Sequence, residues 1–217
     1  MTRNLNRFVF SIVLLLLSGL AVQQTWGQRA DCAGGVCYPD SGWGPTSGTR
    51  YVIPDDPTVP SSLGHSAHCR IFVADGSTGS GTLIARNDAT GLVLTCAHLF
   101  DAATSNIIVA FPDGARYGGR LIDRDRANDL AAVLIGHPDV GPVSVDDDWR
   151  IELSAASMLT AGGYGGDGRF RPVRGPVSGT VQAVGATDPS VKITGTVRPG
   201  DSGGGVLDAD GRLIGVV

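Results

Sequence analysis

The chain has 217 residues, of which 32 are glycine and only 18% are charged. Glycine is about twice as frequent as the roughly 7% of an average protein, which favours a β-rich fold with many tight turns over a helical bundle. The formal net charge is −4. This charge excludes the basic surface expected of a nucleic-acid-binding protein, so we expect no nucleic-acid partner.

The N-terminus, residues 1–27, predicts an export signal. Arg3 and Arg7 precede an apolar run of fifteen residues, 8–22. This run is shorter than the roughly 20 residues that span a bilayer, and small residues suited to cleavage follow it, at Gly19-x-Ala21 or Thr25-x-Gly27. We therefore expect a secreted or periplasmic protein of net charge −6, with no stable membrane anchor after the signal is cleaved.

Residues 28–64 predict a linker. This segment holds five of the twelve prolines together with many Gly, Ser and Thr residues, and it shows neither helical nor strand periodicity. Such a composition is typical of a flexible connection between an export signal and a folded domain.

Four cysteines, Cys32, Cys37, Cys69 and Cys96, allow three complete disulfide pairings in an exported protein. Cys32 and Cys37 can close a small local loop. Cys69 and Cys96 fall on strands expected to be adjacent in one core, where they can approach each other. A zinc site is not supported, because no second close pair of ligands completes four.

From residue 65 to the last residue, short β-type runs alternate with turn signals such as Asp75-Gly76 and Asp113-Gly114. Many short strands at this spacing predict an all-β domain built as a sandwich or as barrels. Two barrels would meet near residues 136–142. The expected strands lie within residues 70–76, 80–85, 91–99, 106–114, 120–125, 129–135, 154–166, 177–185, 190–197, 205–211 and 212–217, with a helical turn after His98.

The stretch Gly200-Asp-Ser-Gly-Gly204 formally matches the G-x-S-x-G elbow of α/β-hydrolases. In that fold the acid and the histidine follow the serine, whereas all four histidines here precede Ser202. When the histidine and the acid are sought before the serine, all three residue types of a nucleophilic triad are present. His98 ends an apolar strand, Asp129 opens another, and Ser202 follows in the glycine loop, which is a known order for a nucleophilic triad.

Each residue type suits a step of acyl transfer. Imidazole titrates near neutral pH, so His98 can take the proton of Ser202 and return it to a leaving amine. Asp129 would hold the imidazole tautomer. The backbone N–H groups of Gly200 and Ser202 would form the oxyanion hole, and glycine neighbours leave that corner uncrowded.

The segments VLTCAH, NDLAAV and GDSGGGV resemble the three active-site motifs of trypsin-like serine proteases, over about residues 66–217. The compact gaps between the motifs, and the segments at 111–135 and 207–217, are more similar to the bacterial HtrA/Deg-like branch than to animal trypsins. The resemblance implies a double β-barrel with the triad between the barrels. It also implies a specificity pocket with Thr196 at its base, which offers no carboxylate to Lys or Arg and favours a small or medium apolar residue.

Some residues depart from these patterns. Leu99 replaces the cysteine that follows the histidine in animal trypsins, and Asp201 replaces the asparagine usual in the HtrA-type branch. In trypsins that aspartate binds a new N-terminal ammonium after zymogen cleavage. Residues 70–73 resemble such a cleavage site, but they lie so close to the next strand that we interpret them as the first barrel strand. The partner of Asp201 stays open.

The remaining candidates have ordinary explanations. We interpret the other histidines, His65, His68 and His137, as surface or linker residues. Asp123 and Asp125 are typical of caps or solvated turns, and Cys96 of a small buried hydrophobe. Residues 163–168 match G-x-G-x-x-G, but no helix follows, so a dinucleotide site is not expected.

The sequence thus predicts a secreted serine endopeptidase acting on proteins or peptides, without cofactor or metal. The alternatives are an inactive trypsin-fold binding or scaffold module, or an inactive fragment of a longer protease. The resemblance implies further strands after Val217, so we expect the second barrel to be truncated at the C-terminus in these residues.

Overall fold

The computed structural model describes residues 31–33, 36–38, 65–146, 153–155, 157–181 and 190–217. Of residues 31–33, 36–38 and 65 only the backbone is described. The predicted export signal, and residues 28–30 and 39–64 of the predicted linker, lie outside this part. No helix in the described residues is long and apolar enough to cross a membrane.

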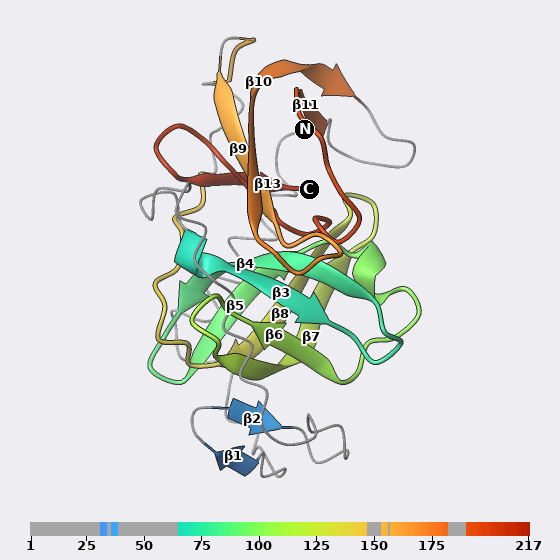
Figure 1. Cartoon of the computed structure of the whole chain (residues 1–217), viewed down its shortest axis with the longest axis vertical. Coiled ribbons are helices and arrows are strands. Elements are labelled where there is room, and N and C mark those ends of the chain that lie inside the picture. The colour runs from blue at the N-terminus through green and yellow to red at the C-terminus, as the bar shows by residue number, and fades with distance from the viewer. Residues whose placement is uncertain (1–30, 34–35, 39–64, 147–152, 156, 182–189) are drawn as a thin grey trace.

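Six antiparallel strands close into a first barrel, drawn in teal to yellow-green in Figure 1. The order is β7-β6-β3-β4-β5-β8, and pairing of β7 with β8 completes the ring. The strands are β3 (His68–Phe72), β4 (Thr78–Arg86), β5 (Thr90–Thr95), β6 (Ile107–Ala110), β7 (Arg116–Asp125) and β8 (Leu130–Gly136). Closure leaves none of these six strands with a free edge within the ring.

The core fills this barrel because β5 and β8 are apolar on both faces. All six residues of β5 and the first six of β8 are buried. Leu92, Val93, Ala131, Ala132 and Val133 have no exposed surface. A run that is apolar throughout is expected for strands covered on both faces.

A second, curled antiparallel sheet of five strands lies beyond the first barrel (Figure 1). Its order is β11-β10-β9-β12-β13. The strands are β9 (Met158–Gly163), β10 (Arg171–Val181), β11 (Ser190–Ile193), β12 (Gly205–Leu207) and β13 (Leu213–Val216). The described residues contain no α-helix, and their two helical turns are 3₁₀: η2 (His65–Ala67) and η3 (His98–Phe100). The predicted all-β, trypsin-like double-barrel class is therefore confirmed, with the second sheet curled as half a barrel.

Two short strands, β1 (Asp31–Ala33) and β2 (Val36–Tyr38), form a hairpin that extends the first sheet. The hairpin joins that sheet where Val36 pairs in parallel with Arg116 of β7. Cys32 stands opposite Cys37 in the hairpin register. Their side chains lie outside the described part, so a bond between them stays a prediction.

A buried aromatic cluster joins the two sheets. The ring of His68 on β3 lies 5.0 Å from that of Phe170, which precedes β10. The Tyr164 hydroxyl donates to the carbonyl of His68 at 3.2 Å. His68 is 2% exposed and its Nδ1 bonds the Thr82 hydroxyl at 3.0 Å. The interpretation of His68 as a surface or linker residue is therefore wrong. The strand that follows η2 carries this histidine into the seam between the sheets.

The expected approach of Cys69 to Cys96 is also wrong, since both thiols are free. Cys69 lies on β3 and Cys96 directly follows β5, and β4 stands between these strands. Neighbouring strands are about 4.8 Å apart. Two spacings therefore exceed the roughly 7 Å between Cα atoms that a disulfide can bridge.

Candidate active site

His98 and Asp129 form a hydrogen-bonded pair next to two neighbouring strands of the first barrel. The strands that precede and follow them, β5 and β8, are neighbours, with Thr95 opposite Ala131. His98 Nδ1 lies 2.7 Å from Asp129 Oδ2, and the backbone N–H of His98 donates to Oδ1 at 2.8 Å. The bond at Nδ1 requires its proton there. In the neutral ring Nε2 then carries the free electron pair that a general base needs.

The backbone conformation of Asp129 is set by the turn that precedes it. Asp125 Oδ1 accepts from the N–H groups of Ala127 and Asn128, at 2.9 and 3.1 Å. Asp129 follows with a φ of +54°, in the left-handed region that Asp and Asn tolerate better than most residues. The Ala97 N–H donates to the Asp129 carbonyl at 3.1 Å. The turn role predicted for Asp125 is confirmed.

The glycine loop that carries Ser202 is fastened to the first barrel through Ser80 on β4. The Ser80 N–H donates to the Ser202 carbonyl, and its hydroxyl donates to the Gly200 carbonyl, each at 2.8 Å. Gly203 has a φ of +86°, and a Cβ there would lie 2.2 Å from both Ser80 O and Thr95 Oγ1. Only glycine therefore allows the loop to approach so closely.

These contacts hold Ser202 beside the segment that carries His98. Thr95, three positions before His98, donates from its hydroxyl to the Ser80 carbonyl at 2.7 Å. A Cβ on Gly203 would also lie 3.1 Å from Cys96 N. His98 Nε2 lies 3.6 Å from Cys96 Sγ. Among the hydrogen bonds of the described residues none joins His98 to the Ser202 hydroxyl. Such bonds are often long before substrate binds.

The Cys96 thiol is not a second nucleophile. Burial raises the pKa of Cys96 to about 11, and the nearby Asp129 carboxylate adds to the rise. Thiolates, and not thiols, react as nucleophiles, so Cys96 is nearly unreactive at neutral pH. Burial raises the pKa of Cys69 still further. Both residues fit small buried hydrophobes.

Two backbone N–H groups near Ser202 are available to a ligand. Within the described part of the chain, the N–H groups of Gly200 and Ser202 donate to no other group. Both belong to the predicted oxyanion hole. Gly200 has a φ of +93° as the third residue of a turn in which Asp201 N donates to Arg198 O at 3.0 Å. Pro199 and a left-handed Gly200 define a type II turn.

Thr196, the predicted pocket residue, is exposed in the loop between β11 and this turn. Two polar residues at the site were not predicted, Ser80 and Arg198. Arg198 supplies the partner of Asp201 that the sequence left open, with 2.9 Å between Nη2 and Oδ1. The three-residue spacing between Arg198 and Asp201 could have predicted this pair, because the first and fourth residues of a β-turn lie side by side. No group of three or more potential metal ligands occurs among the residues with described side chains.

A closed six-stranded barrel bearing a His–Asp pair, joined to a second sheet bearing a serine in a glycine turn, defines the double-barrel class of serine peptidase folds. The family model described as "Trypsin-like peptidase domain" matches residues 79–216. The chain belongs to this family.

Curated relatives are similar to the chain over its folded part. A "Serine protease HtrA-like" of Staphylococcus epidermidis is 28% identical over 156 residues, which are 66% of this chain and 26% of that protein. A "Serine protease Do-like HtrA" of Bacillus subtilis is 27% identical over 150 residues, 65% of this chain and 33% of that protein. The chain thus spans about a quarter to a third of these relatives.

Solved structures of serine proteases have a similar fold. The structure titled "HtrA-type protease AlgW with tripeptide" superimposes with a TM-score of 0.62 at 25% identity, covering 71% of this chain and 51% of that one. The inactive form of the Rv3671c protease, at 22% identity and a TM-score of 0.58, covers 80% of this chain and 86% of that one and supports the fold alone. The predicted resemblance to the HtrA/Deg-like branch is confirmed.

Proposed function

We propose that the chain is an exported serine endopeptidase that hydrolyses peptide bonds through His98, Asp129 and Ser202 and an acyl-enzyme. The observation that carries this proposal is that the Asp129 carboxylate accepts two hydrogen bonds from His98, one from Nδ1 and one from the backbone N–H. It favours the tautomer that leaves Nε2 as a base. Ser202 lies on the loop held against β4, where the N–H groups of Gly200 and Ser202 donate to no other described group. Family membership and HtrA-type relatives support the same reaction.

In the proposed reaction, Ser202 Oγ attacks the carbonyl carbon of the peptide bond while its proton passes to His98 Nε2. The Asp129 carboxylate stabilises the imidazolium, and the oxyanion accepts hydrogen bonds from the N–H groups of Gly200 and Ser202. The C–N bond then breaks and His98 returns the proton to the leaving amine. Water, deprotonated by the same imidazole, attacks the acyl-enzyme and releases the carboxylic acid.

The proposed substrates are proteins or peptides, and the similar HtrA-type protease AlgW, whose structure holds a tripeptide, supports this class of substrate. Thr196 is the proposed base of the pocket for the residue before the scissile bond. Its uncharged side chain gives no counter-charge to Lys or Arg, so a small or medium apolar residue is preferred. Profiling with a peptide library checks this preference, and strong cleavage after Arg would overturn it.

Export is part of the proposal. Residues 1–27 have the charge and apolar pattern of a signal, and several relatives are named probable periplasmic endoproteases. Residues 28–64 then connect the mature amino terminus to a protease domain at 65–217. Mass determination of the protein exported by a bacterial host checks the cleavage, and an intact amino terminus would contradict it.

A fluorophosphonate probe tests the nucleophile. We expect the full chain to be labelled at Ser202, and we expect Ser202→Ala to lose both labelling and about 10⁶-fold in turnover while keeping its circular dichroism spectrum. Ser154→Ala, a change in an exposed serine of the second half, is the control and should label fully. A folded chain that resists the probe would instead support a binding or scaffold module, or an inactive fragment.

A further inference from the structure

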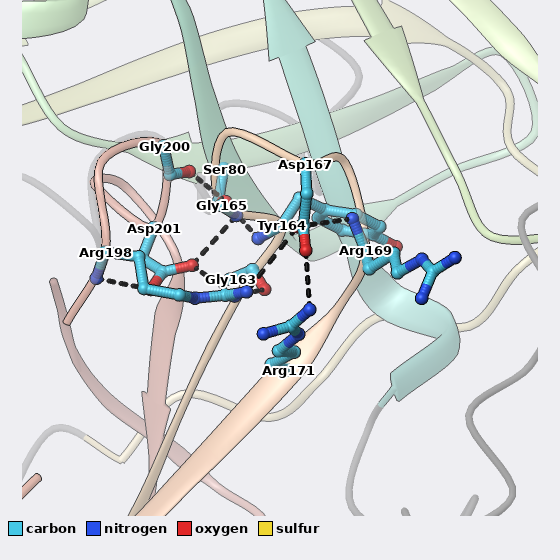
Figure 2. Close-up of polar contacts among 10 residues, drawn as sticks. All are labelled: Ser80, Gly163, Tyr164, Gly165, Asp167, Arg169, Arg171, Arg198, Gly200 and Asp201. Atoms are coloured by element: carbon cyan, nitrogen blue, oxygen red, sulfur yellow. Dashed lines mark hydrogen bonds and ion pairs between the residues drawn. The ribbon is translucent and has the colours of Figure 1, made fainter. Parts of the chain in front are cut away.

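The carboxylate before the nucleophile, Asp201, is 5% exposed and is bound on both oxygens. Oδ1 accepts from the N–H of Gly165 and from Nη2 of Arg198, both at 2.9 Å. Oδ2 accepts from the backbone N–H of Arg198 at 2.8 Å and from its Nε at 3.2 Å. Figure 2 shows the guanidinium lying along this carboxylate. A buried carboxylate needs a paired cation and hydrogen-bond donors, and Arg198 supplies the cation and three of the four donors here.

Arg198 and Asp201 are the first and fourth residues of the type II turn. Types I and II differ by a flip of the central peptide, whose N–H belongs to the third residue. In this turn the third residue is Gly200. The contacts between the first and fourth residues keep the turn closed, and within the closed turn the φ of +93° at Gly200 gives the type II direction of this N–H, a proposed oxyanion donor.

The guanidinium also ties the turn to the connection between β9 and β10. Nη2 of Arg198 donates to the Gly163 carbonyl at 3.3 Å, and Nη1 lies 3.5 Å from Asp167 Oδ1. A Cβ on Gly165, whose φ is +47°, would lie 2.7 Å from the guanidinium carbon. The arginine therefore packs flat against that backbone (Figure 2), and its side chain is only 23% exposed. Asp167 is held in turn by Arg171 at 2.6 Å.

We propose that Arg198 is a positioning residue that neutralises Asp201 and keeps the Arg198–Asp201 turn in the conformation that aims the N–H groups of Gly200 and Ser202 at the oxyanion. This inference rests on the proposed function. It implies a site preformed in the intact chain, because the cation comes from within the turn and no new amino terminus from chain cleavage is required.

The test compares Arg198→Met, Asp201→Asn and the double variant by steady-state hydrolysis of a peptide substrate. Arg198→Met leaves a buried charge unpaired, and we expect kcat to fall about 10² to 10³-fold, as when an oxyanion donor is lost, with KM nearly unchanged. The double variant removes that charge as well and should recover at least tenfold. Arg198→Lys keeps the charge without the planar fork and should lie between the wild type and Arg198→Met.

The matched control is Arg212→Met. Arg212 clamps Asp208 in the same way, with its backbone N–H on Oδ1 and its Nε on Oδ2, both at 2.8 Å, but in the β12–β13 hairpin. We expect its turnover to stay within about twofold of wild type while its stability falls, as for loss of a partly buried ion pair. Equal losses in Arg198→Met and Arg212→Met, or no recovery in the double variant, would overturn the inference.

Amide hydrogen exchange over residues 198–205 separates this inference from the proposed function. Arg198→Met should speed exchange there and Arg212→Met should not, whether or not the chain hydrolyses peptides. If the wild type is not labelled by the fluorophosphonate but the exchange result holds, the proposed function fails, while the part of the inference that Arg198 holds the turn at 198–201 stands. Unchanged exchange in a folded Arg198→Met variant overturns the positioning role. If that variant does not fold, the same comparison is made with Arg198→Lys.

Discussion

At the scale of single residues, the site combines a common side-chain pair with an uncommon backbone conformation. Asp129 binds His98 while its own φ is +54°, so the residue at this position must suit a left-handed backbone as well as the imidazole. His98 and Asp129 are each about half exposed, at 52% and 49% of the side chain. Solvent screens a pair so exposed, so its value lies in orienting the ring more than in stabilising the fold.

Because the Asp129 carboxylate orients the imidazole more than it stabilises the fold, Asp129→Asn should lower turnover far more than stability. Asparagine tolerates the left-handed region as aspartate does, so the unfolding free energy should change by less than about 1 kcal/mol. The amide donates where the carboxylate accepted, and the imidazole then takes the other tautomer, so kcat should fall about 10⁴-fold. Asp129→Ala is the comparison, since it removes the pair and also strains the turn. Turnover near wild type in Asp129→Asn would show that His98 is not the base.

Ser80 shows why part of the site could not be predicted from sequence. Nothing in the order of residues places β4 against the turn at 198–201, because that contact joins a strand of the first barrel to a connection within the second sheet. The sequence could single out His98, which ends an apolar run, Asp129, which begins one, and Ser202 in its glycine-rich turn, because their order in the chain is characteristic; their roles stay a proposal. Thr196 was predicted from resemblance alone and stays a prediction.

At the scale of elements, the strands of the first barrel could be predicted because their apolar runs are short and bounded by turn pairs. β10 begins at Arg171, six positions before the expected strand at 177–185. The first half of β10 was not predicted because Pro172 and Pro176 argue against a strand there. Both lie where β10 pairs with β9 but not yet with β11, whose pairing begins at Val177. A missing N–H is tolerated on such an unpaired side.

The junction between the nucleophile loop and the first barrel predicts a severe effect for Gly203→Ala. Its φ of +86° disfavours alanine, and the new Cβ would overlap Ser80 O and Thr95 Oγ1. We expect a loss of about 2 kcal/mol or more in stability from strain and overpacking, and loss of peptide hydrolysis as the loop shifts.

Gly215→Ala, on β13, is the matched control, because a Cβ there meets nothing within 4 Å. Urea unfolding and turnover, measured on both variants, check the prediction. A Gly203→Ala protein as active as Gly215→Ala would mean that the loop does not need its close approach to β4.

At the scale of the whole molecule, the site exists only while the two sheets stay together. His98 and Asp129 belong to the first barrel, and Ser202 to the connection between strands of the second sheet. The seam between the sheets includes His68, Tyr164 and Phe170, all at most 5% exposed. Phe170 lies 5.0 Å from the His68 ring and 5.4 Å from that of Tyr164. It therefore contacts both halves of the seam.

Phe170→Ala should weaken this seam more than it weakens either sheet. Removal of a buried phenylalanine costs about 3–5 kcal/mol, and here much of that loss falls on contacts between the sheets. In wild type we expect peptide hydrolysis and the far-ultraviolet circular dichroism signal to be lost over the same range of urea. In Phe170→Ala hydrolysis should disappear at lower urea than the strand signal. Phe111→Ala is the control, because Phe111 is 1% exposed inside the first barrel core. Its two curves should move together, and coincident curves in Phe170→Ala would refute the idea that this cluster holds the halves of the site in register.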